Sequence, residues 1–181
     1  MLFGEGFFMV PMKKRASRRW GYVVGAVVAA LAGSALHFLY DALPNPLTAL
    51  ISPVNESVWE HLKLLFFPTL ATALVLSRRE PQPHRFWSGF FAALLAAPLA
   101  LTGVYYLLLA GFGVSSTALD ITLYFLTMFW AFSLAYRLRE SGRLERAAPW
   151  LLLPVSLYGA SLVLFTFAAP ALPIFAPPVG R

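Results

Sequence analysis

Cysteine is absent from this sequence, and charged residues are scarce, at 12% of the chain. Without cysteine the protein has no disulfides, no thiolate metal ligands and no cysteine nucleophile. Soluble domains carry about 25% charged and about 45–50% apolar residues. This chain has half that charged fraction and 59% apolar residues, so a soluble fold is excluded. The 181 residues therefore predict a single bundle of membrane-spanning helices, with no room for a separate soluble domain.

Five segments are apolar enough to span a bilayer as helices of about 20 residues. Ser52 followed by Pro53 predicts an N-cap with proline at the first helical position, and so the start of the second span. We expect an all-α, polytopic membrane bundle with a basic segment at 1–19, a transmembrane domain at 20–170 and a tail at 171–181 that folds back. The expected spans are Trp20–Tyr40, Pro53–Ser77, Phe86–Phe112, Leu119–Leu138 and Ala148–Ala169.

Twelve of the fourteen Lys and Arg lie on one side of this arrangement. The stretches 13–19, 78–85 and 137–146 carry twelve Lys and Arg, whereas the connections 41–52 and 113–118 carry none. By the positive-inside rule, the amino terminus is cytoplasmic and the carboxyl terminus external. We expect a multi-pass protein of a bacterial inner membrane, with the lipid bilayer as its partner. The net charge of +6 is then a topology signal, and nucleic-acid binding is not expected.

The start of the chain imitates a secretory signal peptide, because a basic run precedes an apolar stretch and the triplet Ala30-Leu31-Ala32. Polar residues continue at helical spacing directly after that triplet, so we expect the segment to remain attached as the first span. Whether Met1 or Met12 is the natural start stays open.

The first span also carries a row of small residues at four-residue spacing, which predicts close packing against another helix. The row comprises Gly21, Gly25, Ala29 and Gly33.

Ionisable residues gather near the predicted external ends of the spans, where charges are costly and are usually paired or functional. Ser34, His37 and Asp41 share one face of the first helix. On the second helix the same spacing places three further ionisable residues on one face, and His61 points about 100 degrees away from Glu60, one of the three. These three are Glu56, Glu60 and Lys63, and the fourth span adds Asp120 and Tyr124.

The string Pro53-Val54-Asn55-Glu56-Ser57-Val58-Trp59-Glu60-His61-Leu62-Lys63, preceded by Ser34 and by His37 to Asp41, is distinctive. It resembles the signature of a family of small bacterial integral membrane proteins of unknown function. The resemblance covers most of the chain and implies a multi-helix membrane fold without an assigned activity. A fainter likeness is to membrane hydrolases that hold zinc with Ser, His and Asp, although their paired downstream histidines are missing here.

This set of side chains indicates a divalent-metal site, because two histidines, a carboxylate and an open water position suit zinc. Zinc would lower the pKa of its bound water, Glu60 would act as general base and Lys63 would stabilise an oxyanion. We therefore hypothesise a hydrolase that acts on an external lipid, amide or ester. The expected ligands are His37, His61, Glu56 and Asp120, and the expected outer shell is Ser34, Asp41, Asn55 and Tyr124.

A second interpretation is a non-enzymatic protein whose polar cluster fixes helix register or binds a partner. Glu56 and Glu60 would then pair with Lys63, and His37 would be held by a polar neighbour on its own helix.

A third interpretation is proton-linked transport or binding of a small molecule at the external face. Transport needs a polar path across the bilayer, and the cytoplasmic halves of the spans offer little of one. The chain also shows no inverted repeat of the kind that many transporters contain.

Overall fold

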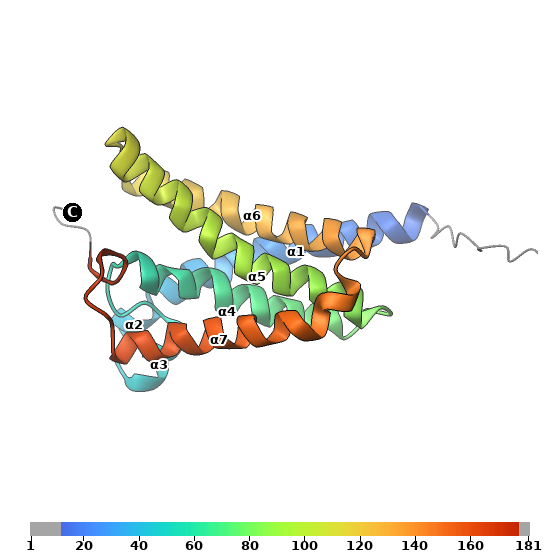
Figure 1. Ribbon diagram of the computed structural model, residues 1–181, viewed down its shortest axis with the longest axis horizontal. Helices are drawn as coiled ribbons and strands as arrows, with labels where there is room; N and C mark the ends of the chain where they lie inside the picture. The colour runs from blue at the N-terminus through green and yellow to red at the C-terminus, as the bar shows by residue number, and fades with distance from the viewer. Residues whose placement is uncertain (1–11, 178–181) are drawn as a thin grey trace, which may run out of the picture.

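The structure, a computed structural model, describes residues 12–177, and the backbone in that range is helical without strands. Five helices are long and apolar enough to cross a membrane, which confirms the expected all-α membrane bundle (Figure 1). Much of the predicted basic segment belongs to the first helix, while residues 1–11 and 178–181 lie outside the described range. The five are α1 (Met12–His37), α4 (Val58–Ser77), α5 (Pro83–Tyr106), α6 (Thr117–Ser141) and α7 (Ala148–Phe167).

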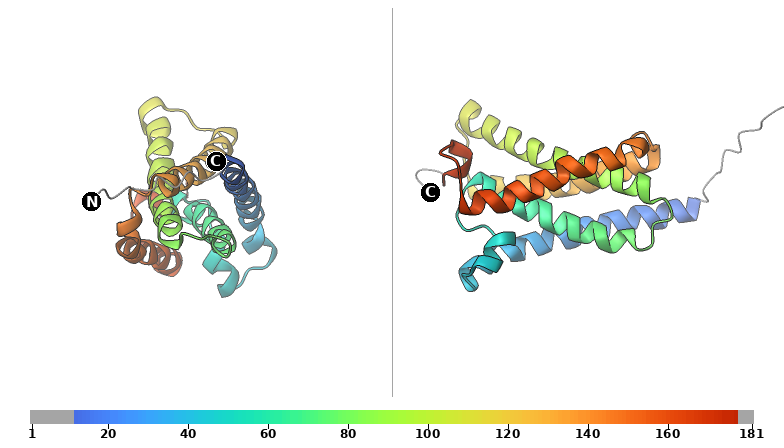
Figure 2. Two further views of the ribbon diagram at one scale, coloured as in Figure 1. Left: turned by 90° about the vertical axis from the view of Figure 1, so that its right-hand side faces the viewer. Right: turned by 60° about the horizontal axis from the view of Figure 1, so that its bottom comes forward.

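Helix α4 is the most buried of the five, and it lies between α1 and α7 when the bundle is viewed along its length (Figure 2). It also packs against α5, which in turn forms the most extensive helix pair with α6. One apolar cluster joins α1, α4, α5 and α6 around Phe90 and Phe132, and a second joins α4, α5 and α7 around Phe66 and Leu162. Side chains on α4 can therefore reach α1 on one side and α7 on the other.

Two short helices, α2 (Leu39–Ala42) and α3 (Pro46–Ile51), lie between α1 and α4. The prediction that Ser52-Pro53 starts the second span is wrong. Asn45 caps α3 by accepting hydrogen bonds from the amides of Leu47 and Thr48, and Ser57 caps α4 by accepting from the amide of Glu60. Side-chain oxygens at these positions satisfy the free amides of a helix start, and Ser52 instead ends α3 in an extended conformation.

Small residues bring α1 close to its neighbours, as the row on the first span predicted. A Cβ on Gly33 would lie 2.1 Å from the Tyr124 hydroxyl and 2.6 Å from the Leu64 carbonyl oxygen. Gly25 likewise faces Phe132 at 3.0 Å, whereas Gly21 has nothing within 4 Å. Gly33 therefore sets the contact of α1 with α4 and α6 one turn before His37.

Ion pairs close the end of the bundle at which α4 meets α5, which we call the basic end. Arg139 is buried and bonds to Glu80 at 2.7 Å and also to Glu140, which accepts from Arg18 at 2.8 Å. These pairs join α1 and α6 to the loop after α4. The cations of the basic end are thus partly structural.

The opposite end holds α2, α3 and the end of α7, and we call it the histidine end because His37 and His61 lie there. A π-helical turn, η1 (Leu107–Gly111), prolongs α5, and the end of α5 and the start of α6 lean away from the other helices (Figure 1). After α7 the described part of the tail folds back through a 3₁₀ turn, η3 (Pro173–Phe175). Its Phe175 packs on Trp59 with ring centroids 4.9 Å apart.

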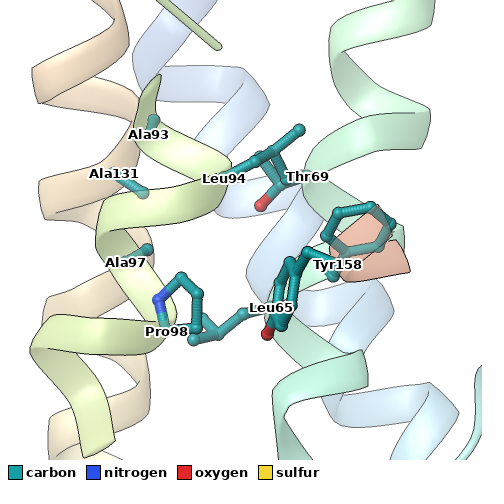
Figure 3. A pocket seen from close by; sticks show the side chains of 9 residues that line it. Leu65, Thr69, Ala93, Leu94, Ala97, Pro98, Ala131 and Tyr158 are labelled. Atoms are coloured by element: carbon teal, nitrogen blue, oxygen red, sulfur yellow. The ribbon is translucent and has the colours of Figure 1, made fainter. Parts of the chain in front are cut away.

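A small cavity lies inside the bundle between α4, α5, α6 and α7 (Figure 3). Its walls are mainly apolar, including Leu65, Ala97 and Pro98, and the Thr69 hydroxyl beside it bonds to the sulfur of Met128 at 3.3 Å. It offers no carboxylate, imidazole or ammonium group, so the chemistry is sought at the histidine end.

Candidate functional site

The first component of the site is His37, the last residue of α1. The helix stops there because Phe38 turns the chain, with its amide bonded to the carbonyl of Ala35, before α2 begins at Leu39. The predicted continuous face from Ser34 through His37 to Asp41 is therefore interrupted. Asp41 lies exposed on α2.

The second component is His61, in the first turn of α4. Its Nδ1 lies 2.8 Å from the carbonyl oxygen of Ser57, the N-cap of the same helix. A carbonyl only accepts hydrogen bonds, so Nδ1 carries the proton and Nε2 presents a lone pair when the ring is neutral. This lone pair points toward α1, where the Nε2 of His37 lies 3.2 Å away.

The third component is Glu56, which precedes α4 and is not part of it. The prediction that Glu56 shares a helix face with Glu60 and Lys63 is wrong, because the helix begins only at Val58. The loop instead brings its Oε2 to 3.4 Å from the Nε2 of His61. One ligand atom each from His37, Glu56 and His61 lies within 4.8 Å of the others, and these three residues form the histidine cluster.

Two separations within the histidine cluster match those between ligand atoms of a tetrahedral zinc site. Zinc binds imidazole nitrogen and carboxylate oxygen at about 2.1 Å, so two ligand atoms at tetrahedral positions lie about 3.4 Å apart. The measured separations are 3.2 Å between the two Nε2 atoms and 3.4 Å between Nε2 of His61 and Oε2 of Glu56. The Glu56 side chain is 68% exposed, so a fourth position would face solvent.

The outer shell of the histidine cluster is uneven. The bond from Nδ1 of His61 to the Ser57 carbonyl is the type of contact that orients metal-binding histidines. The Nδ1 of His37 is buried and has no hydrogen-bond partner among the described residues. Of the two imidazole ligands, His61 would therefore have a hydrogen-bond partner that orients it, and His37 would have none among the described residues.

Glu60 and Lys63, the predicted base and oxyanion donor, form a separate buried pair with Nζ and Oε2 2.6 Å apart. The three ammonium hydrogens of Lys63 are matched by three acceptors, since Nζ also bonds to the carbonyls of Ala49 at 2.8 Å and Ser52 at 3.3 Å. Glu60 accepts from the Val54 amide at 3.0 Å and the Thr166 hydroxyl at 3.1 Å. Both side chains are thus committed to protein partners, as the structural interpretation expected for Glu60 and Lys63.

A second hollow, of about 360 Å³, opens between α7 and the α2–α3 segment. Three residues of its lining, Ala49, Val54 and Thr166, hydrogen-bond to the Glu60–Lys63 pair. The pair therefore lies directly behind this hollow.

The remaining predicted residues lie around the histidine cluster without joining it. Asp120 is in the first turn of α6, which leans away from α1 and α4, and it is not among the three converging residues (Figure 1). The Ser34 hydroxyl bonds to the Ala30 carbonyl within α1, and Asn55 accepts from the Ser57 amide before α4. Tyr124 donates to the Ala30 carbonyl at 3.0 Å and so packs below the cluster.

Two residues make contacts next to the site that were not predicted from the sequence, Ser52 and Thr166. Ser52 is fully buried and bonds to both sides of the α1 break. Thr166 reaches Glu60 from α7, 106 residues away in the chain, and no local pattern indicates such a contact. For Ser52 the sequence gives no distinguishing signal, because the same connection also contains the polar residues Asp41, Asn45 and Thr48.

Comparison with known proteins yields one match. The Family of unknown function (DUF6512) matches residues 9–180, whereas no curated protein and no solved structure matches the chain. The expectation of an uncharacterised family is thereby confirmed. Because the match spans nearly the whole sequence, the protein belongs to this family of unknown function.

Proposed function

We propose that this membrane protein binds one divalent transition-metal ion, zinc, at its histidine end through His37, His61 and Glu56. The observation that carries the proposal is the pair of separations, 3.2 Å and 3.4 Å, which match the edges of a tetrahedral zinc site. Imidazole and carboxylate ligands without thiolates also suit zinc. Asp120, expected as a fourth ligand, is outside this set.

The proposed location of the metal is the external face of the membrane. The connections at the histidine end carry no Lys or Arg, whereas the basic end gathers the arginines of two loops. By the positive-inside rule the basic end is cytoplasmic. We propose a multi-pass protein of a bacterial inner membrane on this ground.

We further propose hydrolysis as the reaction class, since a solvent-facing fourth position is the arrangement of catalytic rather than purely structural zinc. Zinc in such a position supplies an activated water, and substrates at this depth are lipids, amides or esters near the interface. Glu60 does not act as the base in this scheme, because both of its oxygens accept hydrogen bonds inside the protein. Glu56 is the single carboxylate of the histidine cluster, and in this proposal it is a zinc ligand that lies exposed beside the open position.

The test is elemental analysis of the protein purified in detergent without added metal or chelator. The parent is compared with His37→Ala, His61→Ala and Glu56→Gln. The matched control is His84→Ala, which removes the third histidine, an exposed residue in the first turn of α5.

Near-stoichiometric zinc in the parent and in His84→Ala, with loss in His37→Ala and His61→Ala, supports the metal site. A parent without metal, even after zinc addition, overturns it and favours the structural or partner-binding interpretation. Hydrolysis is then assayed on ester and amide probes in detergent. A zinc-loaded parent as inactive as His37→Ala on these probes would contradict the reaction class while leaving the metal site intact.

A further inference from the structure

The break in α1 at His37 has an unusual hydrogen-bond pattern. In an uninterrupted helix the amide of Tyr40 would donate directly to the carbonyl of Leu36, four residues earlier. Here the Tyr40 amide donates to the Ser52 hydroxyl at 3.1 Å, and that hydroxyl donates to the Leu36 carbonyl at 2.6 Å. The Ser52 hydroxyl is therefore inserted into a helical hydrogen bond that spans His37.

Insertion of a side chain into the helical ladder is one of the few causes of a sharp helix kink. Ser52 is completely buried, so water does not compete for either bond. The insertion coincides with the end of α1 at His37 and the turn at Phe38. The break in the helix beside His37 thus involves a residue 15 positions further along the chain.

Ser52 is in turn fixed to α4, the helix that carries His61. Its carbonyl accepts from Lys63 Nζ at 3.3 Å, and the carbonyl of Ala49, three residues earlier, accepts from the same group at 2.8 Å. Lys63 is fully buried and paired with Glu60. A continuous series of bonds therefore runs from α4 through Ser52 to the two residues that bracket His37.

We propose that Ser52 is a positioning residue for the metal site, a role that rests on the proposed zinc binding. Its hydroxyl opens α1 at His37 and so sets the 3.2 Å separation between the Nε2 atoms of His37 and His61. The Glu60–Lys63 pair anchors Ser52 in the frame of α4. Ser52 touches no ligand atom of the histidine cluster and acts only through the backbone on either side of His37.

The primary test is Ser52→Ala in the full-length protein, with Co²⁺ as a spectroscopic probe and Zn²⁺ in competition. Without the hydroxyl, the Tyr40 amide and the Leu36 carbonyl can bond directly and straighten the helix. Straightening would move His37 away from His61, and we expect metal affinity to fall by about 10–100-fold, the range that follows when a ligand loses the partner that orients it. Ser133→Ala is the matched control, because its hydroxyl bonds to a carbonyl of its own helix at 2.8 Å, remote from the site.

Two double variants separate positioning from general destabilisation. In a His37→Ala background, Ser52→Ala is expected to cause no further loss of the residual Co²⁺ affinity, because its effect passes through His37. Tyr40→Pro added to Ser52→Ala removes the amide that would close the helix, and its ring clashes with the Leu36 carbonyl. This second change is expected to restore the kink and to recover metal affinity.

Parent-like affinity in Ser52→Ala would overturn the positioning role while leaving the zinc site standing. An equal loss of affinity in the His37→Ala background, or no recovery on adding Tyr40→Pro, would also overturn it. A parent that binds neither Co²⁺ nor Zn²⁺ would overturn both the metal site and the role of Ser52.

Discussion

Replacing Lys63 with methionine keeps most of the side-chain volume and removes the ammonium. The ammonium is completely buried and makes three hydrogen bonds, so its loss leaves the Glu60 carboxylate, 3% exposed, without its counter-charge. Removing one partner of a buried ion pair costs about 3–5 kcal/mol. Glu60 keeps donors from Val54 and Thr166, which places the expected loss at about 3 kcal/mol, the lower part of that range.

The double variant Glu60→Gln/Lys63→Met isolates the charge contribution, because it leaves no unpaired buried ion. Replacing both members of such a pair is often close to neutral, so we expect the double variant to be more stable than Lys63→Met alone. Unfolding by SDS in mixed micelles, followed by circular dichroism, measures both differences. A loss below about 1 kcal/mol in Lys63→Met would refute the buried-pair reasoning and would fit a solvent-accessible, catalytic lysine instead.

Three further predictions concern the contact of α1 with α4, the ion pairs of the basic end, and the proposed metal site. Gly33→Ala should separate α1 from α4, because its Cβ would meet the Leu64 carbonyl at 2.6 Å. Both thermal stability and Co²⁺ affinity should therefore fall, and a variant that keeps both would contradict the close contact. Arg139→Leu should leave Glu80 buried without a cation and lower the melting temperature, whereas exposed Arg137→Leu serves as the matched control that should not. Acidification should release the metal, since protons compete for imidazole; pH-independent Co²⁺ binding would argue against histidine ligands.

The five spans could be predicted from apolar length alone, and the start of α4 shows what decides the boundary of a helix. Length and hydropathy place a span within a few residues, but the first helical residue depends on which polar side chain caps it. The connection between α1 and α4 contains three candidate helix starts, after Asn45, Ser52 and Ser57. Two of these signals compete for the start of α4: Ser57 with Glu60 fits the Ser-x-x-Glu pattern, and Ser52-Pro53 fits a cap followed by proline.

That boundary decided which site residues could be grouped correctly. His37 and His61 were placed together because each lies near the same end of a span, which periodicity and topology determine. The grouping of Glu56 with Glu60 and Lys63 on one helix face is wrong, because a helix starting at Pro53 would turn Glu56 toward Lys63, whereas the true start at Val58 leaves it in a loop beside His61. The metal hypothesis already groups Glu56 with His37 and His61, and the structure brings these three residues together. Asp120 is predicted as a ligand but is not among the converging residues, because the lean of α6 depends on how it packs with α5, which the sequence does not indicate (Figure 1).

The metal and structural interpretations of the polar cluster are compatible, because α4 presents its charges on two faces. Glu60 and Lys63 are three residues apart and share a face, on which they bond to α3, α7 and the segment between α3 and α4. His61 is turned by about 100 degrees from Glu60 and faces α1 instead. A buried pair saturated by protein groups cannot bind a metal, but it can hold Ser52 and hence the break at His37. On the proposed zinc site, the ionisable residues at the histidine end have two linked roles: Glu60 and Lys63 fix the backbone, and His37, His61 and Glu56 offer ligands.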